Sequence, residues 1–131
     1  MLTENGRRFL GFVRFGELAT INRDGTPQQS VMWYLLRGDE IVMNTARGRL
    51  KERNLRRDPR LSLCVSDGYS YVTITGRARL IDDPTIAQAD IAALARRYEN
   101  AEAAERAIRD FQTQDRVSII VRIEKAIERG V

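Results

Sequence analysis

The residues with the clearest chemical potential lie in one short stretch, residues 44–60, where basic side chains are concentrated. From Arg47 to Arg60 the chain has seven basic and two acidic residues, a local charge of +5, whereas the whole chain is +4 from 22 basic and 18 acidic residues. The stretch favours a helix start, where cations face the positive end of the helix dipole and unpaired N–H groups. An anion bound there would remove this conflict, so the pattern predicts a phosphate site.

The side chains that many enzymes use for catalysis are missing. The chain has no histidine and a single cysteine, Cys64, which lies in an apolar run. Catalysis by Ser-His-Asp or Cys-His groups, histidine bases and histidine-bound metal or haem are therefore excluded, as are zinc sites of the usual ligand sets. We expect no metal site, an inert buried thiol, and chemistry carried by a bound cofactor.

Length and composition predict one domain covering residues 1–131. Apolar residues make up 43% and charged residues 31% of the chain, which is ordinary for a globular protein. No apolar run approaches the roughly 20 residues needed to cross a bilayer. Arg7, Arg8 and Arg14 interrupt the N-terminal region, so we expect no secretory signal and no membrane association. Together with the single cysteine, this predicts a cytoplasmic protein.

The apolar periodicity and the turn signals predict a mostly β protein with helices, an α+β fold. Most of the predicted strands are joined by hairpin turns, such as Asp24-Gly25 and Asp67-Gly68, which implies antiparallel pairing and a barrel. Thr3, Asp83 and Asn100 are the expected helix N-caps. The six predicted strands are 18–21, 27–36, 40–44, 60–66, 71–81 and 117–124. The predicted helices are 3–15, 48–57 and two within an insert at about 84–114.

Several short segments carry a resemblance to a known family, in register from about residue 10 to 83. They are Gly16–Ile21, Asp24–Ser30, Asn44–Lys51, Arg53–Leu63, Tyr71–Val72 and Gly76–Ala78. The combined pattern resembles the pyridoxamine-5'-phosphate-oxidase-like split-barrel flavoproteins. Within them, it is most similar to the oxidoreductases that depend on the deazaflavin coenzyme F-420.

The resemblance implies a six-stranded antiparallel split barrel that forms a homodimer, with two cofactor sites at the subunit interface. By this resemblance, Arg49 and Lys51 match the basic pair that holds the cofactor phosphate, and the strand through Trp33 matches the strand that lies along the cofactor ring. The implied activity is hydride transfer between coenzyme F-420 and a small organic substrate. The cofactor-binding residues implied are Gln28, Ser30, Trp33, Asn44, Thr45, Arg49, Leu50, Lys51 and Asn54.

Two alternatives stay open for the cofactor and the function. Flavin mononucleotide also carries a phosphate, although the acidic tail of coenzyme F-420 suits the arginine-rich stretch slightly better. The chain could instead be a non-catalytic cofactor carrier or a nucleic-acid binder. Residues 47–60 contain no aromatic side chain to stack on bases, which makes nucleic-acid binding the weaker hypothesis.

No catalytic acid or base is assigned from the sequence. A proton could come from solvent or from Tyr34. Trp33 and Tyr34 are neighbours on a predicted strand and should point to opposite faces, one of them into the core. The vitamin-B6 oxidases bind their substrate with a C-terminal arginine and histidine; this chain has no histidine, so we do not expect that activity.

Overall fold

A curled antiparallel sheet forms the body of the molecule in the computed structural model, which describes all residues 1–131. The strands follow the order β2-β1-β5-β6-β7-β4-β3, and β8 pairs with β6 outside this path. The eight strands are β1 (Gly16–Ile21), β2 (Pro27–Met32), β3 (Leu35–Arg37), β4 (Glu40–Ala46), β5 (Arg60–Asp67), β6 (Ser70–Ile81), β7 (Arg116–Arg122) and β8 (Lys125–Arg129). This arrangement confirms the predicted split-barrel fold.

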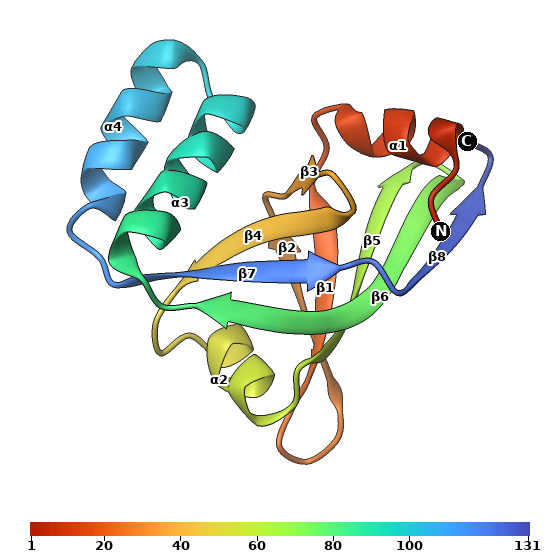
Figure 1. The fold of residues 1–131 in the computed structure, drawn as a ribbon, viewed down its shortest axis with the longest axis horizontal. Coiled ribbons are helices and arrows are strands. Elements are labelled where there is room, and N and C mark those ends of the chain that lie inside the picture. Colours follow the sequence, from red (N-terminus) through yellow and green to blue (C-terminus); the bar gives the residue numbers. More distant parts are fainter.

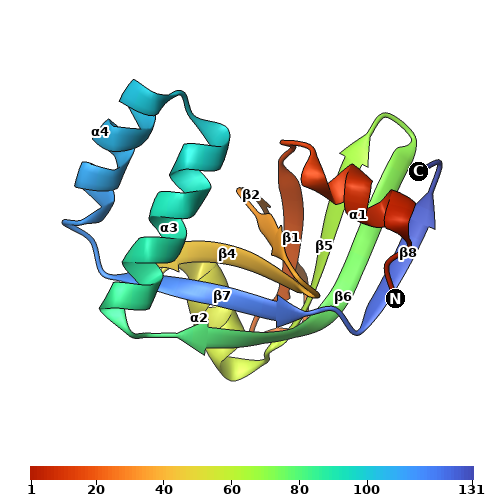
Figure 2. The ribbon, with the colours of Figure 1, turned by 45° about the horizontal axis from the view of Figure 1, so that its top comes forward.

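Four helices surround the sheet: α1 (Glu4–Gly11), α2 (Leu50–Arg57), α3 (Pro84–Tyr98) and α4 (Ala101–Phe111). Helices α3 and α4 stand side by side at one end of the sheet, whereas α1 lies at the other end beside both chain termini (Figures 1 and 2). Thr3, Asp83 and Asn100 cap α1, α3 and α4 as predicted. No helix is long and apolar enough to cross a membrane.

The predicted strand 27–36 is wrong in one respect, because it is two strands, β2 and β3, separated by Trp33 and Tyr34. The side chain of Tyr98 takes the place of a neighbouring strand: the Tyr34 N–H donates to the Tyr98 hydroxyl oxygen at 3.1 Å. The Tyr34 ring is fully buried and its hydroxyl donates to the carbonyl of Leu10 at 2.9 Å. These long-range contacts have no local sequence signal.

The predicted strand 117–124 also needs correction, since the chain changes partners at its end and continues as β8. The N–H of Ile123 donates to Asp39 and the N–H of Glu124 donates to Thr75, so the backbone leaves β4 and continues along the first half of β6. The number of strands is therefore eight and not six.

Helix boundaries shift for a similar reason. Predicted helix 3–15 ends at Gly11, where the Arg97 guanidinium binds the carbonyls of residues 10–12. Predicted helix 48–57 begins at Leu50, because Gly48 has φ +90°, a left-handed conformation that suits glycine, and Arg49 is the extended N-cap. Arg49 and Lys51 thus lie at the start of α2.

The barrel interior holds a core of 16 buried apolar residues contributed mainly by the sheet, with Phe9 and Leu10 of α1 closing one end. A second, smaller core joins α3 to α4 through Ala92, Ala95, Ala104 and Ile108. Trp33 and Phe111 pack against this second core. The helix pair therefore has a small core of its own, and its side faces the β2–β3 connection.

Gly76 is where β6 passes from its partner β8 (through Thr75) to its partner β7 (from Ala78). A Cβ there would lie 2.6 Å from the carbonyl oxygen of Arg122 and 2.8 Å from Val121 Cγ1. We expect Gly76→Ala to lower the free energy of unfolding in urea by about 1–3 kcal/mol, because backbone atoms must move. Gly11→Ala is the control, since nothing lies within 4 Å of its added Cβ. Equal stability of the two variants would contradict this account.

Candidate functional site

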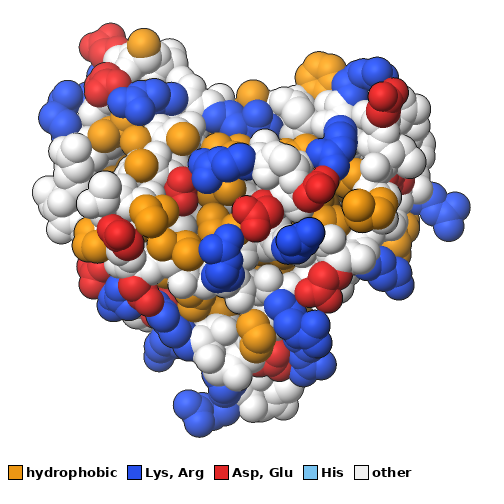
Figure 3. All heavy atoms as spheres, in the orientation of Figure 1, with side chains coloured by type: hydrophobic (Ala, Val, Ile, Leu, Met, Phe, Trp, Pro, Cys, Tyr) orange, Lys and Arg blue, Asp and Glu red, His pale blue; other side chains and the backbone are white.

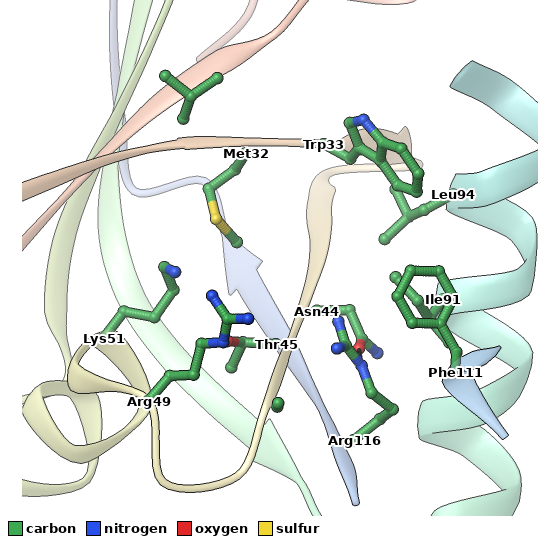
Figure 4. A pocket seen from close by; sticks show the side chains of 12 residues that line it. Met32, Trp33, Asn44, Thr45, Arg49, Lys51, Ile91, Leu94, Phe111 and Arg116 are labelled. Atoms are coloured by element: carbon green, nitrogen blue, oxygen red, sulfur yellow. Dashed lines mark hydrogen bonds between the residues drawn. The ribbon is translucent and has the colours of Figure 1, made fainter. Parts of the chain in front are cut away.

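A cavity of about 280 Å³ opens between the start of α2, strand β4, the β2–β3 connection and the helix pair (Figure 4). One side is cationic, the floor is polar and the remaining wall is apolar. The lining residues are Val31, Met32, Trp33, Asn44, Thr45, Ala46, Arg49, Lys51, Ile91, Leu94, Phe111 and Arg116. The cavity thus joins segments from four separate parts of the sequence.

The loop before α2 directs two cations into this cavity. The N–H of Gly48 donates to Glu52 Oε1 at 2.8 Å, which ties the loop to the first turn of the helix. Arg49 makes no capping hydrogen bond with its side chain, so its guanidinium is free to face the cavity. Lys51 lies two residues further along the chain and lines the same cavity. Figure 4 shows both side chains pointing toward the centre of the cavity.

Three basic residues of the stretch outside the cavity have counter-ions within the chain. Arg47 pairs with Asp82 and Asp115, Arg56 with Glu52 and Asp82, and Arg60 with Asp58. Arg53 and Arg57 of the same stretch form no ion pair, but neither lines this cavity. Three basic side chains of the cavity also form no ion pair within the chain: Arg49, Lys51 and Arg116.

The three unpaired cations act on one another electrostatically. Burial, and then the charges of Arg49 and Arg116, lower the pKa of the Lys51 ammonium. Burial and the charge of Arg49 likewise lower the pKa of the Arg116 guanidinium to about 10. Both shifts mean that positive charge is disfavoured here in the absence of a partner. A bound anion would reverse this, and the residues present therefore fit a phosphorylated or carboxylated ligand.

Arg116 did not appear among the residues predicted from the sequence. It begins strand β7, is 9% exposed, and reaches the cavity from the side opposite Lys51 (Figure 4). A basic residue at the start of a mostly apolar strand was a possible signal. The adjacent Asp115 suggests an ion pair, but that carboxylate binds Arg47. Only the folded chain shows which arginine Asp115 neutralises.

Aromatic rings form much of the apolar wall. Trp33 stacks on Tyr98 with ring centroids 5.3 Å apart and an interplanar angle of 6°. Phe15 stacks on Tyr98 at 5.6 Å, and Phe111 meets Trp33 edge-on at 6.4 Å. The Trp33 ring is thereby held at the cavity edge as a flat surface, while Tyr34 points into the core. The prediction that the two neighbours face opposite sides is confirmed.

Tyr34 is unsuited to supply a proton to a ligand. Its side chain is fully buried, and its hydroxyl proton is donated to the Leu10 carbonyl. Burial is the main reason that the pKa of Tyr34 is raised to about 12. The alternative that Tyr34 provides the proton is therefore wrong.

The structure brings five of the sequence-predicted site residues together and leaves four outside the cavity. Asn54 is buried and donates to Thr20 Oγ1 at 3.1 Å and Asn22 Oδ1 at 3.0 Å, so it joins α2 to β1. Leu50 and Asn54 line a second, basic cavity on the outer side of α2. Gln28 and Ser30 lie on β2 and line neither cavity. The residues brought together are Trp33, Asn44, Thr45, Arg49 and Lys51.

The amino-acid sequence matches the family model described as pyridoxamine 5'-phosphate oxidase over residues 2–128. This chain belongs to that family. The family and its structural relatives include flavin- and deazaflavin-linked oxidoreductase-like proteins, and the resemblance found in the sequence is confirmed.

Solved structures agree with this assignment. A protein described as an F420 reductase is 28% identical with a TM-score of 0.78; the match covers 98% of this chain and 100% of that one. A conserved hypothetical protein of Mycobacterium tuberculosis is 27% identical with a TM-score of 0.80, covering 96% and 83%. A pyridoxamine 5'-phosphate oxidase-like protein of Listeria innocua, at 19% identity and a TM-score of 0.71 over 95% and 94%, shares the fold.

Lys51→Met should stabilise the unliganded protein, because it removes a half-buried charge that faces two other cations. Folding lowers the pKa of Lys51, so its protonated form destabilises the folded state below that lowered pKa. This penalty disappears as pH rises toward 10.5, the value of the unfolded chain. We therefore expect the variant's advantage in thermal unfolding to be largest near neutral pH and to shrink at alkaline pH.

Lys125→Met is the control for this experiment, since Lys125 is exposed on β8 and forms no ion pair. Added inorganic phosphate should raise the unfolding temperature of the wild type more than that of Lys51→Met. A Lys51→Met variant that is less stable than the wild type at neutral pH would contradict the picture of an uncompensated charge.

Proposed function

We propose that this chain is an oxidoreductase that binds coenzyme F-420 in the cavity and acts on a small organic substrate. One observation carries the proposal: Arg49 and Lys51 are unpaired cations on one side of a cavity that also has a flat aromatic wall, formed by Trp33. A phosphorylated cofactor with a planar ring has matching parts. When bound, such a cofactor supplies hydride transfer, for which the chain has no group of its own.

Each lining residue then has a physical role. Arg49 offers a planar fork of donors and Lys51 a compact charge, and together they match the several oxygens of a phosphate. Thr45 and Asn44 supply polar contacts on the cavity floor from β4. Trp33, held by Tyr98, positions the ring and excludes water with Ile91 and Leu94 of α3. The protein would bind, orient and shield the reacting groups.

Coenzyme F-420 is favoured over flavin mononucleotide by the second cavity. Four arginines line it on the outer side of α2: Arg23, Arg53, Arg56 and Arg57. Leu50 lies on this side, whereas its neighbours Arg49 and Lys51 face the first cavity, so the helix start separates the two spaces. Basic side chains also flank the lower lobe in Figure 3, which α2 and the β1–β2 hairpin form together. An acidic tail leaving the first cavity would meet this surface.

A second copy of the chain would complete the site. The cavity volume of about 280 Å³ is just below the roughly 300–1,000 Å³ that is usual for ligand pockets. Beside it, Val31 of the edge strand β2 is 67% exposed, and Phe12 and Phe15 are also exposed apolar residues. We therefore place the homodimer interface at this face, with the cofactor between the subunits.

Equilibrium titration of the purified protein with oxidised coenzyme F-420 tests the proposal, followed by cofactor fluorescence. Arg49→Gln should weaken binding at least about tenfold, because a charge-assisted hydrogen bond to phosphate is lost. Arg109→Gln is the matched control, since Arg109 is exposed on α4 and makes no ion pair. If the wild type does not bind the cofactor, or if reduced coenzyme F-420 is never oxidised with any small organic acceptor, the proposal fails.

Arg53→Gln distinguishes the two cofactors. Arg53 is exposed, has no ion pair and lines only the second cavity. We expect the variant to bind coenzyme F-420 several-fold more weakly at moderate salt, because the acidic tail loses a charged neighbour. Binding of flavin mononucleotide, which has no such tail, should not change. Equal losses for both cofactors, or tighter wild-type binding of flavin mononucleotide, would favour the flavin alternative.

A further inference from the structure

Arg116 is a buried cation with one free donor group. The Nε–H donates to Asn44 Oδ1 at 2.9 Å and Nη1 donates to Gln114 Oε1 at 2.7 Å, both of them neutral acceptors. The remaining nitrogen, Nη2, has no partner in the chain, yet it is not sealed from the cavity that the residue lines. With 9% of its surface exposed, Arg116 should be costly unless an anion completes its environment.

A buried hydrogen-bond network fixes this orientation. Asn44 donates through Nδ2 to the carbonyl of Ala87 at 2.9 Å and to Ser118 Oγ at 3.4 Å. The Ser118 hydroxyl in turn donates to Asp90 Oδ2 at 2.6 Å, so its oxygen is available to accept. Since the Ala87 carbonyl can only accept, the Asn44 amide must present its oxygen to Arg116. The network leaves Nη2 free and does not bring a carboxylate to the guanidinium.

The nearest carboxylate along this network, that of Asp90, is paired with another cation. Asp90 accepts a hydrogen bond from Arg37 Nη2 at 3.1 Å in addition to that from Ser118. Asn44 and Ser118 both lie between Asp90 and Arg116. The chain therefore positions Arg116 firmly through neutral groups while withholding a counter-ion, which is the arrangement that a site for an external anion requires.

The surroundings of Arg116 differ from those of the other two cations. Its guanidinium lies over the Phe111 ring, 4.6 Å from the centroid, and Ile91, Leu94 and Trp33 line the adjacent wall. Figure 4 shows Arg116 on the side of the helix pair and Lys51 on the side of α2. A ligand group bound to Arg116 would therefore continue into apolar and aromatic contacts.

We propose that Arg116 binds the carboxylate of an organic substrate whose flat apolar body lies against Phe111 and Trp33. The substrate class is then aromatic or similarly flat monocarboxylic acids. This rests on the proposed function in placing the substrate in the cofactor's cavity. The anion is a carboxylate because one nitrogen of Arg116 remains free and its neighbours are apolar, whereas Arg49 and Lys51 together match the larger charge of a phosphate.

Trp33 makes the inference testable without cofactor, because it is the single tryptophan of the chain and lines the cavity. Its fluorescence is followed while the protein is titrated with benzoate, and separately with benzamide, which has nearly the same shape but no charge. We expect benzoate to bind at least about tenfold more tightly, as a charged hydrogen-bond partner implies. Arg116→Gln should remove this difference, whereas Arg109→Gln should preserve it.

The inference also predicts two separable anion positions. Arg49→Gln should weaken the binding of inorganic phosphate at least about tenfold and that of benzoate less than about threefold. Arg116→Gln should weaken the binding of benzoate at least about tenfold and that of phosphate less than about threefold. If Arg116→Gln does not fold, a competition experiment on the wild type tests the same point, because phosphate should not compete with benzoate for binding. Equal binding of benzoate and benzamide, no saturable benzoate signal, competitive displacement, or equal losses in both variants would each overturn the carboxylate site.

These outcomes are independent of the cofactor experiment. Failure of coenzyme F-420 to bind, with benzoate still discriminated from benzamide, would remove the proposed function and keep the carboxylate site. Cofactor binding without that discrimination would remove the carboxylate site alone.

Discussion

Positive charge without an internal counter-ion is the constraint on which the site depends. Arg49, Lys51 and Arg116 converge on one cavity, and no carboxylate of the chain reaches them, although acids neutralise Arg47, Arg56 and Arg60 nearby. Such a cluster lowers the stability of the unliganded protein, and the rest of the fold must offset that cost. The binding of an anion is its simplest physical explanation.

The fold holds each of these cations in place without pairing any of them with a carboxylate. The left-handed turn at Gly48 and its bond to Glu52 place Arg49 and Lys51 at the start of α2. Asn44, buried on β4 opposite Ser118 of β7, holds Arg116. These anchors belong to the sheet and to the first turn of α2. The strand pairing that closes the split barrel therefore also sets the positions of the charges.

The α3–α4 pair gives the cavity its apolar wall. Ile91, Leu94 and Phe111 reach over the polar floor, and Tyr98 fixes Trp33 by stacking and by bonding the backbone of Tyr34. The same Tyr98 contacts interrupt the strand between β2 and β3. Tyr98 therefore contacts the chain at the break between two strands and also supports Trp33 in the wall of the cavity, which links the fold irregularity to the site.

The sequence by itself determined the antiparallel strands, the caps at Thr3, Asp83 and Asn100, and the cationic stretch containing Arg49 and Lys51, because alternation, capping and charge are local properties. Tertiary structure decided the breaks at Tyr34 and Ile123, the structural role of Asn54 and the entry of Arg116. Each depends on a partner distant in sequence: Tyr98, Asp39, Thr20 and Asn44. Local patterns place charges along a chain, but only packing decides which of them are neutralised and which face a ligand.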